Sequence, residues 1–589
     1  MKKSTQFYTK QIDVFTTEVA VLKKRLWYFS MFRLSVFLLT VLLVYLFWNS
    51  WQVALVCGVL GTAAFLFLIS RYTDLKDHRN FVKALLALNQ REIEIGKGNY
   101  SNEPAGEAYV NPTHFYSLDI DLFGKGSFFQ YINRTGLKEG TDYFAHLLTE
   151  NSITDIDKKQ AVIQELASKT KFRQSFTAAS TLIKTETPNK EILGWLKLHT
   201  HFTKPFFLYA AYGLSAVTVI AFVLVLMGVI PMDAMGYVLA VGLFSTAAYL
   251  KKVTALAANT EKARDTFKQY SVLLKAIEEE SFSCELLKRK QAAIKESEKL
   301  ASTIFKDFSK LLDALDSRNN MLGAIFGNGF FLMDLRNSYR IEKWMQQYGA
   351  KVSDWFEVVA WFDAYNTLGN FAFNHEAYVY PVLTNDAKCI HAEGLGHPLL
   401  NPEKRVDNNL SIDNRQFFIV TGANMAGKST FLRTVSLHIV MANLGLPVCA
   451  VSSKYTPVKL ITSMRTSDSL NDDSSYFFSE LTRLKYIVDA LQDDAYFIIL
   501  DEILKGTNST DKAIGSRKFV EKLVKANATG IIATHDLSLC ELEDEIPQVA
   551  NHYFDAEIVN DELYFDYRFK DGVCQNMNAS FLLRKMEII

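Results

Sequence analysis

A phosphate-binding loop is predicted where an apolar run meets two glycines, a lysine and a serine. Residues 417–420 predict a buried strand, and Gly422 is followed after four residues by Gly427, Lys428 and Ser429. Glycines let backbone N–H groups face phosphate oxygens, the lysine reaches the β- and γ-phosphates, and the serine hydroxyl ligates Mg²⁺. A helix that begins here adds its positive dipole end. The pattern therefore predicts that ATP and Mg²⁺ bind a loop made of Gly422, Ala423, Asn424, Met425, Ala426, Gly427, Lys428, Ser429 and Thr430.

Two further apolar runs end in residues that suit phosphate chemistry. Residues 496–500 precede Asp501, which is placed to hold Mg²⁺ through water, and Glu502, which can orient or deprotonate the attacking water. Residues 530–533 are followed by His535, which can sense the γ-phosphate or the water. An isolated acidic pair or histidine more often has a structural role, but the upstream phosphate loop favours catalysis. We expect Lys428, Glu502 and His535 to be catalytic and Ser429 and Asp501 to hold the metal.

Together these motifs resemble the ATPase domain of the MutS mismatch-repair family. The segments that carry the resemblance are 422–430, Asp501-Glu502 with Gly506-Thr507, and 533–536, and Asn424-Met425 inside the loop is the most discriminating feature. Segment 475–480 resembles the family segment whose serine reaches the nucleotide of a partner subunit. The resemblance therefore implies an ATPase that works as a homodimer, with Ser475 contacting the nucleotide bound to the other subunit.

The resemblance extends over roughly residues 110–200 and 255–589 and implies a helical core domain before the ATPase domain. The family reads mismatches with a Phe-x-Glu wedge in an N-terminal domain. Here the Phe-x-Glu matches begin at Phe478 and Phe519, inside the ATPase domain. The resemblance thus implies DNA as a partner, while the residues do not support mismatch specificity.

Composition restricts the partners and the compartment. The chain has 589 residues, enough for several domains, and Lys+Arg and Asp+Glu are both 64, so that no basic excess favours nucleic acid. Any DNA contact must come from a local patch. The 6 cysteines are scattered without a Cys-x-x-Cys pair, which argues against disulfides or a zinc site and fits a reducing compartment. No cleavable signal peptide is expected.

Two pairs of long apolar runs predict membrane-spanning helical hairpins. Residues 34–48 and 53–69 form the first pair, and residues 206–230 and 234–250 form the second. Each run approaches the roughly 17–25 residues that cross a bilayer, and none shows the polar face of a soluble amphipathic helix. The first run is short, so its span is expected to begin near Phe29. The alternative is two buried hairpins in a soluble core.

The flanking charges predict the orientation of these four spans. Basic residues at 23–25 precede the first hairpin and Lys251-Lys252 follow the second, whereas the turns 49–52 and 231–233 contain no Lys or Arg. Basic flanks stay on the cytoplasmic side. We therefore expect a multi-pass protein of the inner (cell) membrane, with the ATPase domain in the cytoplasm.

The predicted fold is an α/β P-loop NTPase domain of the ABC/MutS-like kind at the C-terminus, preceded by a mainly α-helical core domain with two transmembrane hairpins. For residues 256–317 two interpretations stay open, a long lever-like helix pair and a helical bundle with a charged, solvated face. The predicted regions are a cytoplasmic segment (1–28), a first transmembrane hairpin (29–70), a helical core-like region (71–204), a second hairpin (205–250), a core or lever-like region (251–395) and the ATPase domain (396–589).

Three functions are compatible with this sequence. The first is a membrane-anchored, dimeric MutS-like ATPase coupled to DNA in a mismatch-repair-related role. The second is an ATP-driven membrane machine or envelope scaffold with no DNA role; a transporter of the ABC type is not expected, because its Leu-Ser-Gly-Gly-Gln signature is absent. The third is a scaffold that binds nucleotide only to dimerise, and the intact Asp501-Glu502 pair argues against it.

Overall fold

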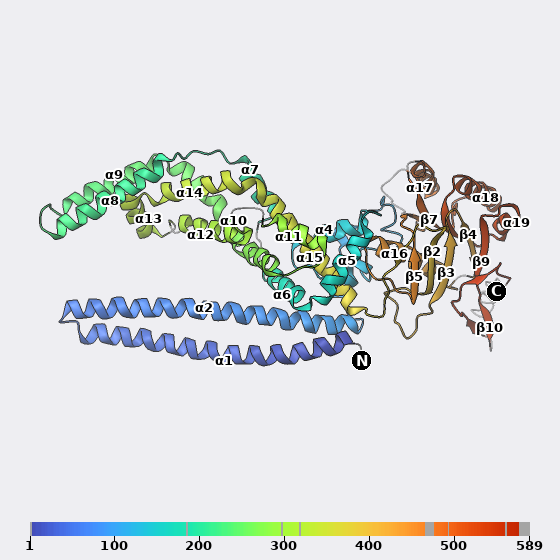
Figure 1. Ribbon diagram of the computed structural model, residues 1–589, viewed down its shortest axis with the longest axis horizontal. Coiled ribbons are helices and arrows are strands. Elements are labelled where there is room, and N and C mark those ends of the chain that lie inside the picture. Colours follow the sequence, from blue (N-terminus) through green and yellow to red (C-terminus); the bar gives the residue numbers. More distant parts are fainter. Residues whose placement is uncertain are drawn as a thin grey trace. The chain divides into compact units, whose positions relative to one another are not determined.

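A computed structural model describes two compact units in this chain (Figure 1). The helical unit comprises residues 1–92, 135–141 and 171–364, and the nucleotide unit comprises residues 93–134, 142–170 and 365–589. The described residues are all except 1–2, 184–186, 296–298, 317, 319, 424, 466–475, 493, 560–561 and 576–589.

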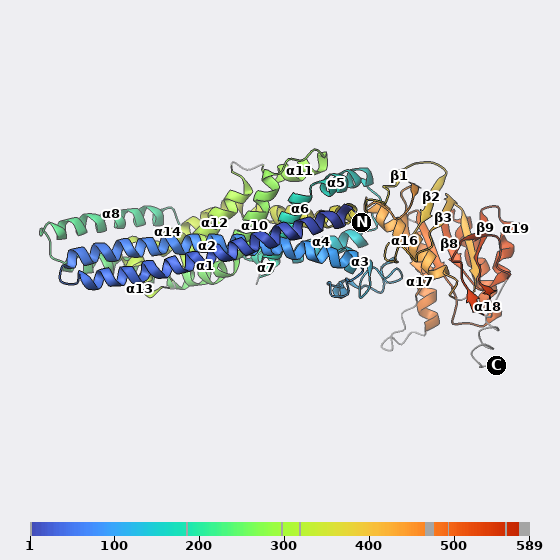
Figure 2. The ribbon, with the colours of Figure 1, turned by 90° about the horizontal axis from the view of Figure 1, so that it is seen from below.

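The helical unit begins with two long helices, α1 (Lys3–Leu46) and α2 (Trp51–Gly96), which run side by side in opposite directions (Figures 1 and 2). They approach so closely at Gly61 that an added Cβ would collide with the Thr40 side chain. The most apolar stretch of α1 is 0% buried and that of α2 is 6% buried, and each helix is long enough to cross a membrane. Both helices continue well beyond the predicted spans, because the charged segments on either side also favour helix.

The second apolar hairpin consists of α8 (Phe206–Leu226) and α9 (Asp233–Ala247), followed by α10 (Leu250–Glu279). The direction of the chain changes by 70° between α9 and the start of α10, so the predicted run 234–250 is not one straight span. In the described part of the chain, three helices are long and apolar enough to cross a membrane, or four if this bent pair counts as one span.

A short apolar helix, α13 (Met321–Phe331), packs against α8 and α9, and the sequence analysis did not foresee it. The contact needs small residues, because a Cβ added to Gly242 of α9 would collide with the backbone of Gly329. The Thr218 hydroxyl of α8 also donates to the Phe330 carbonyl oxygen at 3.0 Å. At 11 residues, α13 is too short to span a bilayer, so it adds apolar surface beside the hairpin.

The remainder of the helical unit is a bundle with an aromatic core. Phe267 of α10 lies 4.8 Å from the rings of both Phe305 and Phe308 and 5.6 Å from Trp344. This packing favours the bundle interpretation of residues 256–317 over the lever-like pair. The helices concerned are α6 (Thr170–Thr181), α7 (Asn189–Leu198), α11 (Glu285–Ala293), α12 (Ala301–Asp316), α14 (Met333–Tyr348) and α15 (Val352–Asn374).

The nucleotide unit is built on a six-stranded sheet of order β12-β9-β4-β8-β7-β6. The edge strand β12 is antiparallel to β9 and the other five strands are parallel to one another, so the carboxyl ends of β4, β8 and β7 lie next to one another. Ligands bind at this edge in such sheets. The strands are β4 (Phe417–Gly422), β6 (Lys459–Ser463), β7 (Tyr496–Asp501), β8 (Thr529–Ala533), β9 (Val549–Phe554) and β12 (Lys570–Asp571).

The nucleotide unit also contains helices, a second sheet of four strands and a two-stranded sheet. Strand β4 is buried along its whole length, as expected for an apolar run that is covered on both faces. The helices of the sheet region are α16 (Lys428–Asn443), α17 (Tyr476–Ala490), α18 (Ser509–Lys525) and α19 (Leu542–Glu545), and those before it include α3 (Phe128–Ile132), α4 (Lys138–Thr149) and α5 (Ile156–Ser168). The second sheet holds β1 (Val382–Leu383), β5 (Ser452–Tyr455), β2 (Lys388–Leu395) and β3 (Asn408–Asp413), and β10 (Glu557–Val559) pairs with β11 (Glu562–Tyr564).

Candidate active site

The loop between β4 and α16 has backbone angles that glycine adopts freely and other residues adopt only with strain. Gly422 and Gly427 have φ values of 146° and 106°, in the region that favours glycine. A Cβ on Gly422 would lie 2.5 Å from the Phe554 carbonyl oxygen, so a larger residue would clash as well as strain. Met425 has a positive φ of 68° and an exposed side chain. The loop thus ends at the N-terminus of α16, where backbone N–H groups are free to bind an anion.

Lys428 lies inside this loop. Its ammonium donates to the carbonyl oxygens of Gly422 at 2.7 Å and Ala423 at 3.1 Å, and Nζ lies 3.4 Å from His535 Nε2. Burial lowers the pKa of Lys428, although the negative charges of Glu502 and Asp501 oppose this effect. The ammonium is therefore poised at the carboxyl end of β4 and can exchange its carbonyl partners for phosphate oxygens.

Two oxygen donors meet at the start of α16. The Ser429 hydroxyl donates to Asp501 Oδ2 at 2.6 Å, and Asp501 is the last residue of β7. Mg²⁺ prefers hydroxyl, carboxylate and water oxygens, so this pair suits the ion. The structure thus brings together the two residues that the sequence analysis assigned to the metal.

Glu502 and His535 form a close ion pair at the ends of β7 and β8. Their side chains approach to 2.6 Å between Oε1 and Nε2, and the Glu502 N–H donates to the Ala533 carbonyl oxygen at 2.9 Å. The hydrogen bond from His535 outweighs burial and lowers the pKa of Glu502 to about 2. Glu502 has a positive φ of 52°, a strained conformation of the kind that clusters at functional sites. The carboxylate is therefore ionised and held in one orientation.

Glu480 on α17 fixes the loop that follows Glu502, a role that was not predicted from the sequence. Its buried carboxylate accepts hydrogen bonds from the Leu504 N–H at 2.6 Å and from the Lys505 N–H at 3.1 Å. Leu504 also has a positive φ, of 60°. A buried acid that holds two consecutive backbone N–H groups stabilises the strained turn that carries Glu502.

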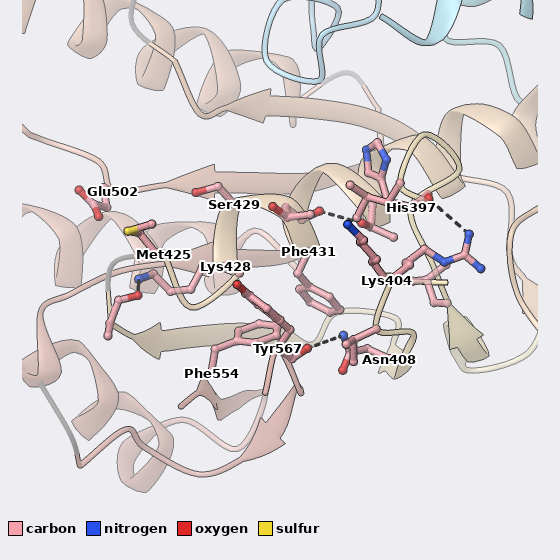
Figure 3. A pocket seen from close by; sticks show the side chains of 18 residues that line it. His397, Lys404, Asn408, Met425, Lys428, Ser429, Phe431, Glu502, Phe554 and Tyr567 are labelled. Atoms are coloured by element: carbon pink, nitrogen blue, oxygen red, sulfur yellow. Dashed lines mark hydrogen bonds between the residues drawn. The ribbon is translucent and has the colours of Figure 1, made fainter. Parts of the chain in front are cut away.

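A pocket of about 420 Å³ opens beside the loop (Figure 3). Tyr567 forms part of its wall near Lys428 and Phe554, and Asn408 holds Tyr567 in place by donating to its carbonyl oxygen at 3.0 Å. Neither residue belongs to a recognisable sequence motif, so neither was predicted to line the site. The lining residues are Leu395, His397, Leu400, Lys404, Arg405, Val406, Asn408, Ala423, Met425, Gly427, Lys428, Ser429, Thr430, Phe431, Thr434, Glu502, Phe554 and Tyr567.

His397 at the edge of this pocket is held neutral. Burial lowers its pKa to about 4, and the positive charges of Arg433 and Arg405 act in the same direction. Arg405 in turn forms an ion pair with Asp407. This side of the pocket therefore presents a neutral imidazole and a paired guanidinium.

The predicted site residues can now be placed. The structure brings together Lys428, Ser429, Asp501, Glu502 and His535 at the start of α16, which follows β4, and at the ends of β7 and β8, as expected for adjacent parallel strands. Of the loop residues, Ala426 is fully buried and Thr430 is exposed at the first turn of α16. Asn424 and Ser475 lie outside the described residues.

Comparison with known proteins identifies the C-terminal domain. Residues 418–584 match the family model described as MutS domain V. The chain is 33% identical over 194 residues to MutS protein homolog 4 of Homo sapiens, which is 31% of this chain and 20% of that protein. It is 32% identical over 216 residues to DNA mismatch repair protein MutS 2 of Halobacterium salinarum (36% of this chain, 25% of that protein). It is 32% identical over 222 residues to DNA mismatch repair protein MutS of Thermotoga maritima (37% of this chain, 27% of that protein).

Each of these similarities covers about a third of the chain, and the matched part spans between a fifth and about a quarter of the length of these relatives. The C-terminal part is therefore a MutS-type domain V, which is an ATPase domain of the ABC type, and the chain is an ATPase. The α/β ATPase domain after a mainly helical region agrees with the predicted fold class.

Proposed function

We propose that this chain is a membrane-anchored ATPase that binds ATP and Mg²⁺ at residues 422–430, hydrolyses ATP with Lys428, Glu502 and His535, and uses the cycle to change the shape of a homodimer that contacts DNA. The observation that carries the catalytic part is the arrangement of Lys428, the Ser429–Asp501 pair and the Glu502–His535 pair at one edge of a MutS-type sheet. We propose the predicted domain boundaries with it, including an ATPase domain at 396–589.

Each residue has a distinct task in this proposal. Lys428 exchanges the carbonyl oxygens of Gly422 and Ala423 for β- and γ-phosphate oxygens. Glu502 is ionised and accepts a hydrogen bond from the attacking water, which aligns the water with the γ-phosphate. A Mg²⁺ ion held by Ser429 and Asp501 supplies positive charge to the phosphate oxygens.

His535 controls how strongly Glu502 can act as a base. A carboxylate with a pKa of about 2 orients water but takes a proton from it poorly. Proton transfer therefore requires His535 to loosen its 2.6 Å contact with Glu502 as the γ-phosphate enters. The 3.4 Å approach of Lys428 Nζ to His535 links the two movements, because Lys428 also shifts when phosphate binds.

The base of ATP is proposed to occupy the pocket beside Tyr567. The Tyr567 ring is partly exposed and offers a face for stacking, which is worth about 1–3 kcal/mol per base in complexes with single-stranded nucleic acids. Asn408 fixes the Tyr567 loop from both sides, since its side-chain oxygen also accepts from the Phe569 N–H at 2.8 Å. Asn408→Ala should therefore raise the Kd for ATP without preventing turnover at saturation.

The homodimer is proposed to complete each site with Ser475 of the other subunit. The family resemblance of segment 475–480 supports this step, and Glu480 links that segment to the loop after Glu502. The molar mass of detergent-solubilised Glu502→Gln should rise from one to two chains on addition of ATP and Mg²⁺. A mass that does not respond to ATP contradicts the dimer.

The inner membrane is proposed as the location, with the nucleotide unit in the cytoplasm. Support comes from α1, α2 and α8, whose apolar windows are almost unburied, and from the basic flanks of the apolar runs. Burying such surface in lipid is favourable, whereas leaving it in water promotes aggregation. After carbonate extraction and ultracentrifugation the chain should stay in the membrane pellet. Release into the supernatant contradicts the anchor.

DNA coupling separates this proposal from an ATP-driven membrane machine without a DNA role. The relatives named DNA mismatch repair proteins support the first, while the equal numbers of acidic and basic residues favour the second. Perfect and mismatched duplexes should be titrated over a range of salt concentrations, because phosphate contacts weaken steeply with salt. Absence of binding at low salt supports the machine without DNA. Binding without mismatch preference removes only the repair role.

A further inference from the structure

Outside the nucleotide site, two histidines and a glutamate of the helical unit gather their donor atoms in one place. His199 Nε2 lies 2.8 Å from Glu342 Oε1, and His201 Nδ1 lies 3.9 Å from Glu342 Oε2. One donor atom from each of the three residues falls within 4.8 Å of the others. This is the one group of three such residues in the described part of the chain with donors this close.

The local fold explains why the three side chains converge. His199 follows α7 in an extended conformation, with φ −64° and ψ 125°. Side chains two positions apart on extended chain point to the same side, so His199 and His201 both face α14. Glu342 lies on the buried face of α14 and meets them there. The ligands therefore come from two separate elements, which is the usual construction of a metal site within a helical bundle.

The carboxylate of Glu342 is oriented as a metal ligand would be. It accepts hydrogen bonds from the Phe202 N–H at 3.1 Å and from the Thr203 N–H at 2.9 Å, and the Thr203 hydroxyl donates to it at 2.5 Å. Such surrounding hydrogen bonds fix the ligating oxygen in metal sites.

Charge compensation points to a cation. Glu342 is almost fully buried, and its ion-pair partners within the described residues are the two histidines, which are neutral when they bind metals. A buried carboxylate without a permanent positive partner is costly, and a divalent ion supplies that charge. His201 is 38% exposed, so one side of the group is open to water and to an incoming ion.

We propose that His199, His201 and Glu342 form a binding site for a divalent transition-metal ion, with Zn²⁺ as the best-suited ion and water as a further ligand. Two imidazoles and one carboxylate are donors that Zn²⁺ accepts in tetrahedral geometry, whereas Mg²⁺ prefers oxygen alone. The site lies a few residues before Phe206, where α8 begins, and α14 packs against α8. A bound ion therefore ties the entry of the second apolar hairpin to the bundle. This is a zinc site without cysteine, which a search for Cys-x-x-Cys pairs could not detect.

The test is metal binding by the full chain, purified in detergent without a histidine tag, stripped with EDTA and kept free of nucleotide. After incubation with Zn²⁺ alone and gel filtration, elemental analysis should find about one Zn²⁺ per chain, and Mg²⁺ should not compete. His201→Ala removes a half-exposed ligand whose loss should leave the fold intact, and it should weaken Zn²⁺ binding by at least the roughly 10–100-fold that loss of a ligand's hydrogen-bonding neighbour costs. His199→Ala should do the same.

His78→Ala is the matched control, since His78 also faces a carboxylate, Glu18 at 3.3 Å, but has no third such donor close by among the residues that the structure describes. It should bind Zn²⁺ as the unaltered chain does. Co²⁺ in place of Zn²⁺ adds a direct readout, because tetrahedral coordination by nitrogen and oxygen gives visible absorption bands that should vanish in His201→Ala. A chain that binds no stoichiometric Zn²⁺, or two histidine variants that bind it unchanged, would overturn the proposal.

Discussion

Replacing Glu502 by Gln tests the catalytic assignment most sharply. Glutamine keeps the size of the side chain but cannot ionise, so it can neither accept a proton from water nor form the ion pair with His535. ATP binding should persist or tighten, because a negative charge near the triphosphate is removed. Positioned acid–base groups contribute about 10²–10⁴-fold to rates, so turnover should fall by that factor, or about 3–5 kcal/mol of transition-state stabilisation.

The titration of Glu502 gives the net stabilisation of its ionised form, to which the hydrogen bond from His535 contributes most and which burial opposes. Its pKa lies at about 2 instead of 4.5, which corresponds to about 3 kcal/mol in favour of the ionised form. Because both side chains are about a quarter exposed, screening by water leaves about 1–2 kcal/mol. A double-mutant cycle of Glu502→Gln and His535→Asn, measured on turnover, should therefore show effects that are not additive.

The same pair predicts a pH dependence of stability. The pKa of Glu502 is lower in the folded chain than in the unfolded chain, so its contribution is complete above about pH 4.5 and disappears as the pH falls towards 2. The difference in melting temperature between the unaltered chain and Glu502→Gln should shrink across that interval. A difference in melting temperature that stays constant across this pH interval would show that ionised Glu502 does not stabilise the folded chain.

The assay combines fluorescent-ATP titration with single-turnover hydrolysis by the detergent-purified chain. Glu557→Gln on the exposed surface of β10 is the control and should behave like the unaltered chain. Weaker binding with normal turnover in Glu502→Gln would refute the catalytic reasoning, because it would place Glu502 in binding alone.

Two further predictions follow from the backbone of the loop and from the apolar helices. Gly422→Ala should abolish ATP binding or lower the stability of the domain by about 1–3 kcal/mol, because φ at Gly422 is 146° and a backbone oxygen lies 2.5 Å from the added Cβ. Gly349→Ala is the control, because Gly349 has a φ of −53° and open space around an added Cβ. It should change neither ATP binding nor the melting temperature. Ile220→Arg on α8 should reduce membrane insertion, because placing an arginine within the bilayer costs about 3 kcal/mol. Val272→Arg on α10, where the side chain is similarly exposed, should insert normally in the same carbonate-extraction assay.

The sequence predicted those parts of the fold that depend on local pattern. The apolar strands before Gly422, Asp501 and His535, and the helix after Gly427, follow directly from residue type and spacing, and parallel pairing brings their ends together. The long bundle helices were predicted as helical, but their exact ends were not, because charged residues continue a helix as readily as they end one.

Other features depended on tertiary contacts that no local pattern encodes. Helix α13 is short and apolar, and it is defined by close packing at Gly242 and Gly329. Tyr567 and Asn408 enter the pocket from segments far apart in the sequence. The buried Glu342, more than a hundred residues from its two histidines, could not be paired with them before the bundle was seen.

ATP hydrolysis by the full chain in lipid nanodiscs shows directly whether the chain is an ATPase that is anchored in a membrane. We expect Mg²⁺-dependent turnover that disappears in Lys428→Ala, whose ammonium lies inside the loop, and persists in Lys518→Ala, on the exposed surface of α18. Turnover that is unchanged in Lys428→Ala, or a nanodisc fraction that contains none of the chain, would contradict this expectation.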